Sequence, residues 1–263
     1  MSTKPIRVWL APPGPNPWKV VVILEELSIP YEIVSIRFED IKKKPFTDLN
    51  PNGRAPAIED PNTGLVLWES GAIVTYLVEQ YDTNNALSYG KDDLMNKHHI
   101  NQWLHFQMSG QGPYWGVAGW FNCFHPEKVP SAIERYNDQV RRVLGVLEGW
   151  LAAKEGGQQW LVGDRITYAD LAWATWNDRL DSVLLCDADR KFEGFPRVRA
   201  WHERMTARPA WRAAMAARSR LMDEQGLDWN GVPKGLGSFS EYEAKIKAGE
   251  EVVAMPKSDT SST

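Results

Sequence analysis

The sequence changes character near residue 82, and this change restricts the folds that are possible. Up to residue 81, short β-type runs alternate with helical segments, whereas residues 91–226 are helical almost throughout. In the first part the patterns predict strands at 6–10, 31–36, 57–58 and 66–67, and helices at 17–27 and 70–81. This order of elements predicts a mixed sheet with helices packed on it.

Helical periodicity predicts a separate all-α domain in the second part. The predicted helices cover 92–121, 131–153, 167–178 and 196–205, and another begins at Pro209. We therefore expect an N-terminal α/β domain over residues 1–82, an all-α domain over 91–226 and a C-terminal extension over 227–263. The polar end of the extension is expected to be disordered.

Composition excludes several kinds of protein. The 263 residues include 30 Lys and Arg against 34 Asp and Glu, so no basic excess is available to neutralise the phosphates of a nucleic acid. Two cysteines cannot form a disulfide framework. Because the chain has neither a long apolar run nor an N-terminal signal-peptide pattern, we expect a cytoplasmic protein that does not bind membranes.

The common motifs of metal, phosphate and nucleophile sites are missing from the sequence. We find no GxGxxG, GxxxxGK[ST], HExxH, CxxC or GxSxG pattern. His98 and His99 are adjacent, and His105 lies too far along a helix to form the usual i, i+4 ligand pair with His98. The sequence therefore predicts no metal site.

Two junctions between predicted elements have the properties of a binding site. Asn16, followed by Pro17, predicts a helix N-cap with Pro at the first helical position. Glu69 and Ser70 stand where the helix 70–81 begins. A helix N-terminus offers free N–H groups and a positive dipole end, both of which suit a carboxylate or a thiolate.

A third junction precedes the strand at 57–58. A cis bond before Pro56 would expose the backbone of Ala55 for pairing with an extended peptide.

Four segments of the sequence resemble the cytosolic glutathione transferases. NPNGRAPAI, residues 50–58, is similar to the glutathione-binding loop of that family, and WESGAIVTYL, residues 68–77, is similar to its Glu-Ser motif. LVGDRITYADLAWATW, residues 161–176, resembles the folding motif of the family. Residues 124–151 are similar to the fungal branch that includes the yeast prion regulator of nitrogen catabolism, whose Asn/Gln-rich prion arm has no counterpart here.

The folding motif also has a physical explanation that does not depend on the family. Thr167 as N-cap and Asp170 three residues later form a variant of the capping box, and Ile166 can pack against Leu171. We interpret these residues as structural.

This resemblance implies a fold and a role for Asn16. The fold would be a thioredoxin-like domain that binds glutathione, joined to an all-α domain that supplies the second substrate, in a homodimer. Asn16 would donate its side-chain amide to the glutathione sulfur, at a position where other classes carry Tyr, Ser or Cys. The alternative is that Asn16 only caps its own helix.

Further residues would hold the rest of the glutathione molecule, again by resemblance. Glu69 would bind the γ-glutamyl ammonium and Ser70 the carboxylate, while the backbone of Ala55 would pair with the cysteinyl unit. Arg54 would lie against glutathione and Lys44 near the glycyl carboxylate, although both also fit ordinary exposed basic side chains.

The segment FQMSGQGPYWGVAGWF, residues 106–121, would border the pocket for the second substrate. Met108 and Trp115 would provide an adaptable apolar surface, and Gly112 would thin or bend the helix. The alternative for each aromatic residue is a place in the core. Cys123 and Cys186 lie in the helical part, which argues against a protein cysteine as the nucleophile.

We therefore expect a glutathione transferase whose bound thiolate attacks an electrophile or reduces a hydroperoxide. Two alternatives stay open. One is a glutathione-dependent cis–trans isomerase of a conjugated double bond in a fungal secondary pathway. The other is a non-catalytic ligand-binding or regulatory protein with the same fold.

Overall fold

The computed structural model describes residues 3–155, 158–228, 230–236 and 239–248. The predicted disorder at the end of the C-terminal extension falls on residues outside this described part.

A four-stranded mixed sheet forms the base of the N-terminal part, as the sequence predicts. Its strands are β1 (Ile6–Leu10), β2 (Tyr31–Ser35), β3 (Ala57–Asp60) and β4 (Leu65–Trp68). The order across the sheet is β2-β1-β3-β4, with β2 parallel to β1 and the other neighbours antiparallel. The short elements η1 (Phe38–Asp40) and α2 (Phe46–Leu49) lie in the long connection between β2 and β3.

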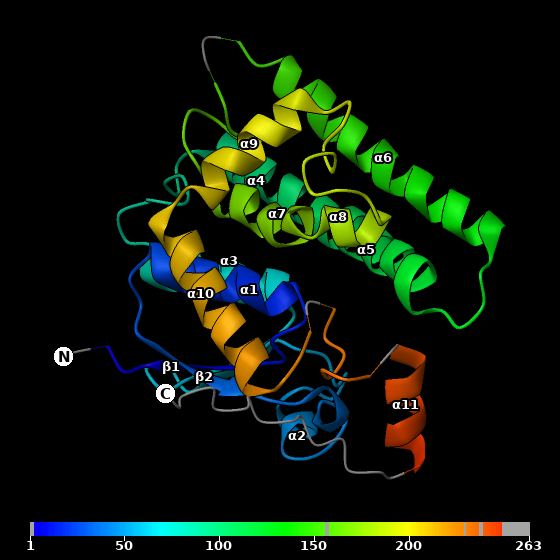
Figure 1. Cartoon of the computed structure of the whole chain (residues 1–263). Helices are drawn as coiled ribbons and strands as arrows, with labels where there is room; N and C mark the ends of the chain where they lie inside the picture. The colour runs from blue at the N-terminus through cyan, green and yellow to red at the C-terminus, as the bar shows by residue number, and fades with distance from the viewer. Residues whose placement is uncertain (1–2, 156–157, 229, 237–238, 249–263) are drawn as a thin grey trace, which may run out of the picture.

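Helix α1 (Asn16–Glu26) is buried on all sides rather than along one stripe. Every residue from Pro17 to Leu24 is buried. The reason is that α1 packs against α3 (Ser70–Tyr81) and also against α7 (Tyr168–Asp178) and α10 (Pro209–Glu224), two helices of the second part. Figure 1 shows α10 lying beside α1.

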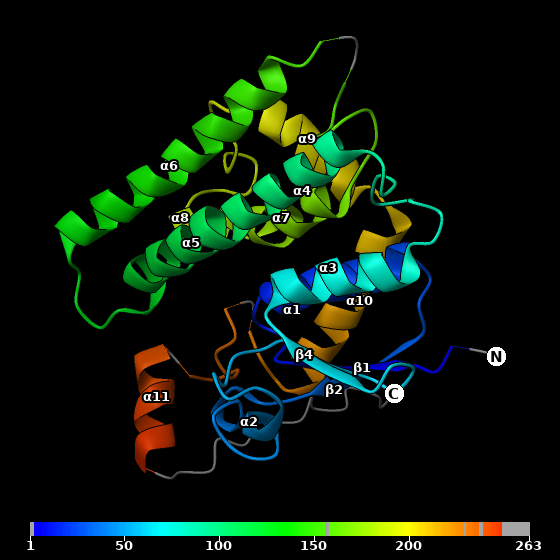
Figure 2. The ribbon, with the colours of Figure 1, turned by 180° about the vertical axis from the view of Figure 1, so that it is seen from behind.

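The second part is all-α. Besides α7 and α10 it contains α4 (Leu94–Phe106), η2 (Gln107–Gln111), α5 (Gly112–Gly119), η3 (Trp120–Phe124), α6 (Pro130–Ala152), α8 (Leu180–Leu184) and α9 (Pro196–Thr206). The C-terminal extension contains α11 (Phe239–Ala248). Figure 2 shows α4 and α5 following one another, with the long α6 alongside. The α/β and all-α halves together confirm the fold class expected from the sequence.

The predicted helix over 92–121 is interrupted by two π-helical turns, η2 and η3. At Gly110, a β-carbon would lie 2.8 Å from the ring of Phe106, so this wide turn needs a residue without a side chain. The sequence pattern is compatible with an unbroken helix, so the interruption is visible only in the structure.

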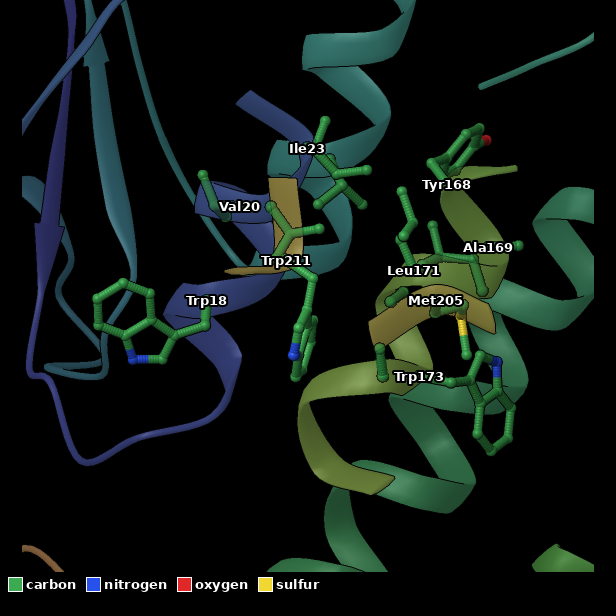
Figure 3. Close-up of a cluster of buried hydrophobic side chains, with 14 of the residues drawn as sticks. Trp18, Val20, Ile23, Tyr168, Ala169, Leu171, Trp173, Met205 and Trp211 are labelled. Carbon is green, nitrogen blue, oxygen red and sulfur yellow. The ribbon is translucent and has the colours of Figure 1, made fainter. Parts of the chain in front are cut away.

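One hydrophobic core continues across both halves of the chain. Figure 3 shows Val20 and Ile23 of α1, Leu171 of α7 and Trp211 of α10 in one cluster. All four side chains are at most 5% exposed. Among the described residues, none of the helices combines the length and apolar character that a bilayer crossing requires.

The capping box at the start of α7 is confirmed, and the structure gives Asp170 more partners than the sequence predicts. The Asp170 carboxylate accepts hydrogen bonds from the backbone N–H of Thr167 at 2.8 Å and from its hydroxyl at 2.9 Å. It also accepts from Leu161 N–H at 2.8 Å and from the indole of Trp201 at 2.9 Å. Asp170 therefore joins three segments inside the core.

We expect Asp170→Ala to lower the free energy of unfolding by about 3 kcal/mol, more than the ~1 kcal/mol of a lost cap, because buried donors lose their acceptor. Urea denaturation would measure the loss. Asp138→Ala is the matched control, since Asp138 is exposed on α6 and should cost little. A loss below about 1 kcal/mol for Asp170→Ala would show that the carboxylate does not organise the core.

Candidate functional site

Asn16 does not cap α1, so the sequence-based N-cap prediction was wrong. Asn16 is the first residue of the helix, Pro15 occupies the cap position, and no side chain caps this end. The side-chain oxygen Oδ1 of Asn16 instead accepts a hydrogen bond of 2.9 Å from Nε1 of Trp176, on α7. The partner comes from the other half of the chain, which local spacing could not reveal.

The bond from Trp176 determines which way the Asn16 amide points. An indole N–H is a donor only, so it must face the amide oxygen. The Nδ2 group of Asn16 then has no hydrogen-bond partner among the described residues. It is a neutral donor, next to the free N–H groups at the start of α1.

The loop before β3 has the predicted geometry. The Ala55–Pro56 peptide bond is cis, Pro56 is buried and Ala55 is partly exposed. Sequence reasoning missed Asn50, which is 1% exposed and shapes this loop. Its side chain donates to the carbonyl of Arg54 at 2.5 Å and accepts from Asn52 N–H at 2.9 Å.

Glu69 and Ser70 lie at the start of α3, as predicted. Glu69 has φ of 72°, a region that residues other than glycine rarely adopt, and its side chain is exposed. Such a conformation costs about 1–3 kcal/mol and tends to occur at functional sites. Ser70 is only 3% exposed. The turn therefore directs an exposed carboxylate and a buried hydroxyl towards different surroundings.

The two basic candidates lie on the surface. Lys44 is 79% exposed and forms an ion pair with Asp48 at 3.0 Å. Arg54 is exposed beside the loop. Both positions fit ordinary surface side chains, and their contacts with glutathione stay predictions.

Lys19 was missed by sequence reasoning, although a lysine within the apolar run PWKVVVIL is itself a signal. It lies on α1, one turn after Asn16, and is 1% exposed. Its Nζ donates to Gln107 Oε1 at 2.7 Å and to Ser70 Oγ at 3.3 Å. It thus connects the start of α3 with η2.

The three residues expected at the second-substrate pocket differ in their surroundings. Met108 of η2 lies next to Lys19 and Ser70, at 3.6 and 3.8 Å from its sulfur. Gly112 lies beside Trp176, whose Nε1 would be 3.8 Å from a β-carbon at that position. Trp115 is 0% exposed, so the prediction that it lines an open pocket was wrong and it is a core residue.

The start of the C-terminal extension packs on the loop that precedes Asn16. A β-carbon on Gly231 would lie 2.6 Å from the side chain of Pro13. Further along, the hydroxyl of Tyr242 donates to Glu39 at 2.7 Å. The described part of the extension therefore lies against the N-terminal half of the molecule.

Neither cysteine has the environment of an activated thiol. Burial raises the pKa of both the Cys123 and the Cys186 thiol. Within the part of the chain that the structure describes, no group of three or more His, Cys, Asp or Glu side chains could hold a metal ion.

Comparison with known proteins assigns a family to this arrangement. Residues 4–79 match the domain described as "Glutathione S-transferase, N-terminal domain", and residues 115–209 match "Glutathione S-transferase, C-terminal domain". The chain belongs to the glutathione S-transferase family. The fold and the family expected from the sequence are therefore confirmed.

Similar proteins come from fungi. The chain is 48% identical over 217 residues to the glutathione S-transferase-like protein gedE of Aspergillus terreus, covering 81% of this chain and 95% of the relative. The glutathione transferase URE2P6 of Phanerochaete chrysosporium, solved with oxidized glutathione, is 40% identical, with a TM-score of 0.76. The match covers 83% of this chain and 98% of that structure. Ure2p in complex with glutathione is 37% identical, with a TM-score of 0.74, and the match covers 81% of this chain and 99% of that structure. These matches confirm the resemblance to the fungal Ure2-like branch.

Proposed function

We propose that this protein is a glutathione transferase that activates glutathione as a thiolate at Asn16. The observation that carries the proposal is the Asn16 amide, oriented by Trp176 so that Nδ2 stays available as a donor. A free thiol has a pKa of about 8.5, and only the thiolate is a strong nucleophile. An amide donor and a helix N-terminus both lower that pKa without a general base.

The remaining contacts of the peptide follow from the neighbouring residues. Glu69 would bind the γ-glutamyl ammonium, Ser70 the carboxylate, and the backbone of Ala55 the cysteinyl unit. Arg54 and Lys44 would lie near the glycyl end, where their exposed charges suit a carboxylate. We place the activity in the cytoplasm, where glutathione is kept largely as the thiol.

The N-terminal part, residues 1–82, would thus hold glutathione, and residues 91–226 would supply the second substrate. Met108 and Gly112 are the candidates for that pocket, together with Trp176, which is partly exposed beside Asn16.

The reaction itself can be identified by the stoichiometry of glutathione. Conjugation consumes one glutathione per product, and reduction of a hydroperoxide converts two glutathione molecules to the disulfide. An isomerase returns glutathione unchanged while product forms, and a protein that only binds forms no product. Mass spectrometry of products with a panel of electrophiles, hydroperoxides and conjugated alkenes would separate these four cases.

We also propose a homodimer formed through the face that carries α4 and α6. A groove of about 650 Å³ between these helices is lined in part by Trp103, Phe106 and Val146. Val146 and Trp150 are 42% and 38% exposed, and on β4 Trp68 is 36% exposed. Figure 2 shows α3, α4 and β4 on the near side of the molecule. A two-fold axis would bring the β4 side of one copy to the groove of the other.

Glutathione at about 100 times its dissociation constant should stabilise the parent protein by ~2.7 kcal/mol. Glu69→Ala and Ser70→Ala should lose most of this shift, because the γ-glutamyl charges lose their partners. Thermal denaturation with and without glutathione measures it. Glu134→Ala and Ser131→Ala on exposed positions of α6 are the matched controls. If all four variants shift like the parent, glutathione binds elsewhere.

Asn16→Ala should raise the pKa of bound glutathione and lower turnover about tenfold near neutral pH, because one donor to the sulfur is removed. Trp176→Phe should also raise the pKa of bound glutathione and lower turnover, but by less. The Asn16 amide is still present in this variant, although the indole no longer orients it. The thiolate absorbance of bound glutathione, titrated with pH, is the measurement. Asn62→Ala, in the turn between β3 and β4, is the control and should leave the thiolate titration unchanged. Identical titrations for all variants would exclude an interaction between Asn16 and the sulfur.

The protein should elute near twice 29.9 kDa on size exclusion. Val146→Glu should shift it towards the monomer, because a charge would be buried in the groove. Leu185→Glu is the control, since Leu185 is 58% exposed at the end of α8. A monomeric peak of the parent across a hundredfold concentration range, or equal effects of both variants, would contradict the proposed dimer face.

A further inference from the structure

Lys19 is a cation inside the protein that none of the proposed contacts with glutathione uses. It is flanked by the buried side chains of Trp18 and Val20, and only 1% of its surface is exposed. No carboxylate oxygen of the described residues lies within 4.0 Å of its Nζ. A buried charge without an ionic partner is costly and needs a compensating anion or hydrogen bonds.

A chain of buried amides holds the hydrogen-bond partner of Lys19 in place. Gln107 Oε1 accepts from Nζ at 2.7 Å, and Gln107 Nε2 donates to Gln111 Oε1 at 2.8 Å. Gln111 Nε2 in turn donates to Asn177 Oδ1 at 2.7 Å. All four side chains are at most 1% exposed. Each amide fixes the orientation of the next, so the side-chain oxygen Oε1 of Gln107 faces the ammonium group of Lys19.

Ser70 is the second partner and lies at the start of α3. Its Oγ accepts from Lys19 at 3.3 Å, while its own hydroxyl points at the sulfur of Met108 at 3.8 Å. A thioether sulfur is a weak acceptor. The Ser70 proton is therefore available for a stronger acceptor, such as a carboxylate.

We infer that Lys19 is a positioning residue of the γ-glutamyl site, where its ammonium acts through the Ser70 hydroxyl on the carboxylate of the bound ligand. This inference rests on the proposed glutathione site. Lys19 donates to Ser70 Oγ, and the hydroxyl of Ser70 donates to the carboxylate in place of the Met108 sulfur. Such a charge-assisted chain is stronger than a neutral one.

The free protein holds the Lys19 proton weakly. Burial lowers the pKa of Lys19 to about 7, and the negative charge of Glu69 opposes this effect. A bound carboxylate raises the pKa again, because it stabilises the charged form. Above pH 7, binding should therefore take up a proton from solvent, and affinity should fall as pH rises.

The other charged side chains on the helices around α1 act on different partners. Glu25 pairs with Tyr31, Glu26 with Arg208, and Asp178 with Lys191, while Asp170 belongs to the capping box. On α3, the charge of Glu79 affects the hydroxyl of Tyr168. On α4, the ring of His105 contacts the carbonyl of Asn101. The other basic side chains of α4 are exposed: Lys97, His98 and His99. On α10, Arg212 donates to the carbonyl of Ala207. Arg218 interacts electrostatically with Asp178, and Arg220 forms an ion pair with Glu224. Glu69 is the charged residue that acts on Lys19.

S-Methylglutathione is the probe for the experiment, because it has no thiol whose ionisation would obscure the proton uptake. Isothermal titration calorimetry in buffers of different ionisation enthalpy, at pH 6 and pH 8, measures the protons bound with the ligand. For the parent we expect most of one proton at pH 8, little at pH 6, and affinity about tenfold weaker at pH 8.

The variant Lys19→Met tests the role of the charge. It should bind S-methylglutathione about tenfold or more weakly at pH 6 and without the proton uptake at pH 8. Its melting temperature should change little, because the gain from removing a buried charge is offset by the loss of the donor to Gln107 Oε1. Lys97→Met, at an exposed position of α4, is the matched control and should behave like the parent.

A second probe identifies the group that Lys19 serves. S-Methyl-(4-aminobutyryl)-cysteinylglycine lacks only the γ-glutamyl carboxylate, so the parent and Lys19→Met should bind it equally weakly and without the uptake. Equal weakening of both probes by Lys19→Met would give Lys19 a purely structural role and overturn the inference. So would a parent that binds S-methylglutathione without proton uptake at pH 8. A parent that does not bind S-methylglutathione at all would instead refute the proposed function.

Discussion

The burial of α1 on every side is the interaction on which the rest of the structure depends. The sheet and α3 cover it from the N-terminal half, and α7 and α10 cover it from the helical half. Because the apolar core runs through α1 without a break, the two halves have one fixed arrangement. The start of α1 is therefore held against Trp176, and the site can use groups from both halves.

The same burial explains the polar groups found between the halves. Lys19 cannot reach water from inside α1, so its hydrogen bonds must come from Ser70 and from Gln107. Gln107 then needs Gln111, and Gln111 needs Asn177 on α7. A buried polar chain that is only partly satisfied is unfavourable, so these bonds favour one placement of η2 against α1 and α7.

The two halves of the chain have different roles in the proposed chemistry. The N-terminal half supplies the groups expected to touch glutathione, while the helical half orients them: Trp176 sets the Asn16 amide and Gln107 holds Lys19. Substitutions in α7 or η2 can therefore change the state of the thiol or of the γ-glutamyl site without touching the ligand. In the proposed site, the second substrate would meet the thiol near Met108, Gly112 and Trp176.

The sequence by itself determined the features that depend on neighbouring residues. These are the four strands, the helix starting at Ser70, the cis bond before Pro56 and the capping box of α7. Spacing, turn residues and caps are local signals, so they are visible in the chain. The tertiary structure alone decided that Asn16 meets Trp176 rather than capping its helix, that Trp115 is core and that Lys19 lies beside Ser70. Asn16 and Trp176 are 160 residues apart, and only the packing of α7 on α1 brings a donor from one half to an acceptor in the other.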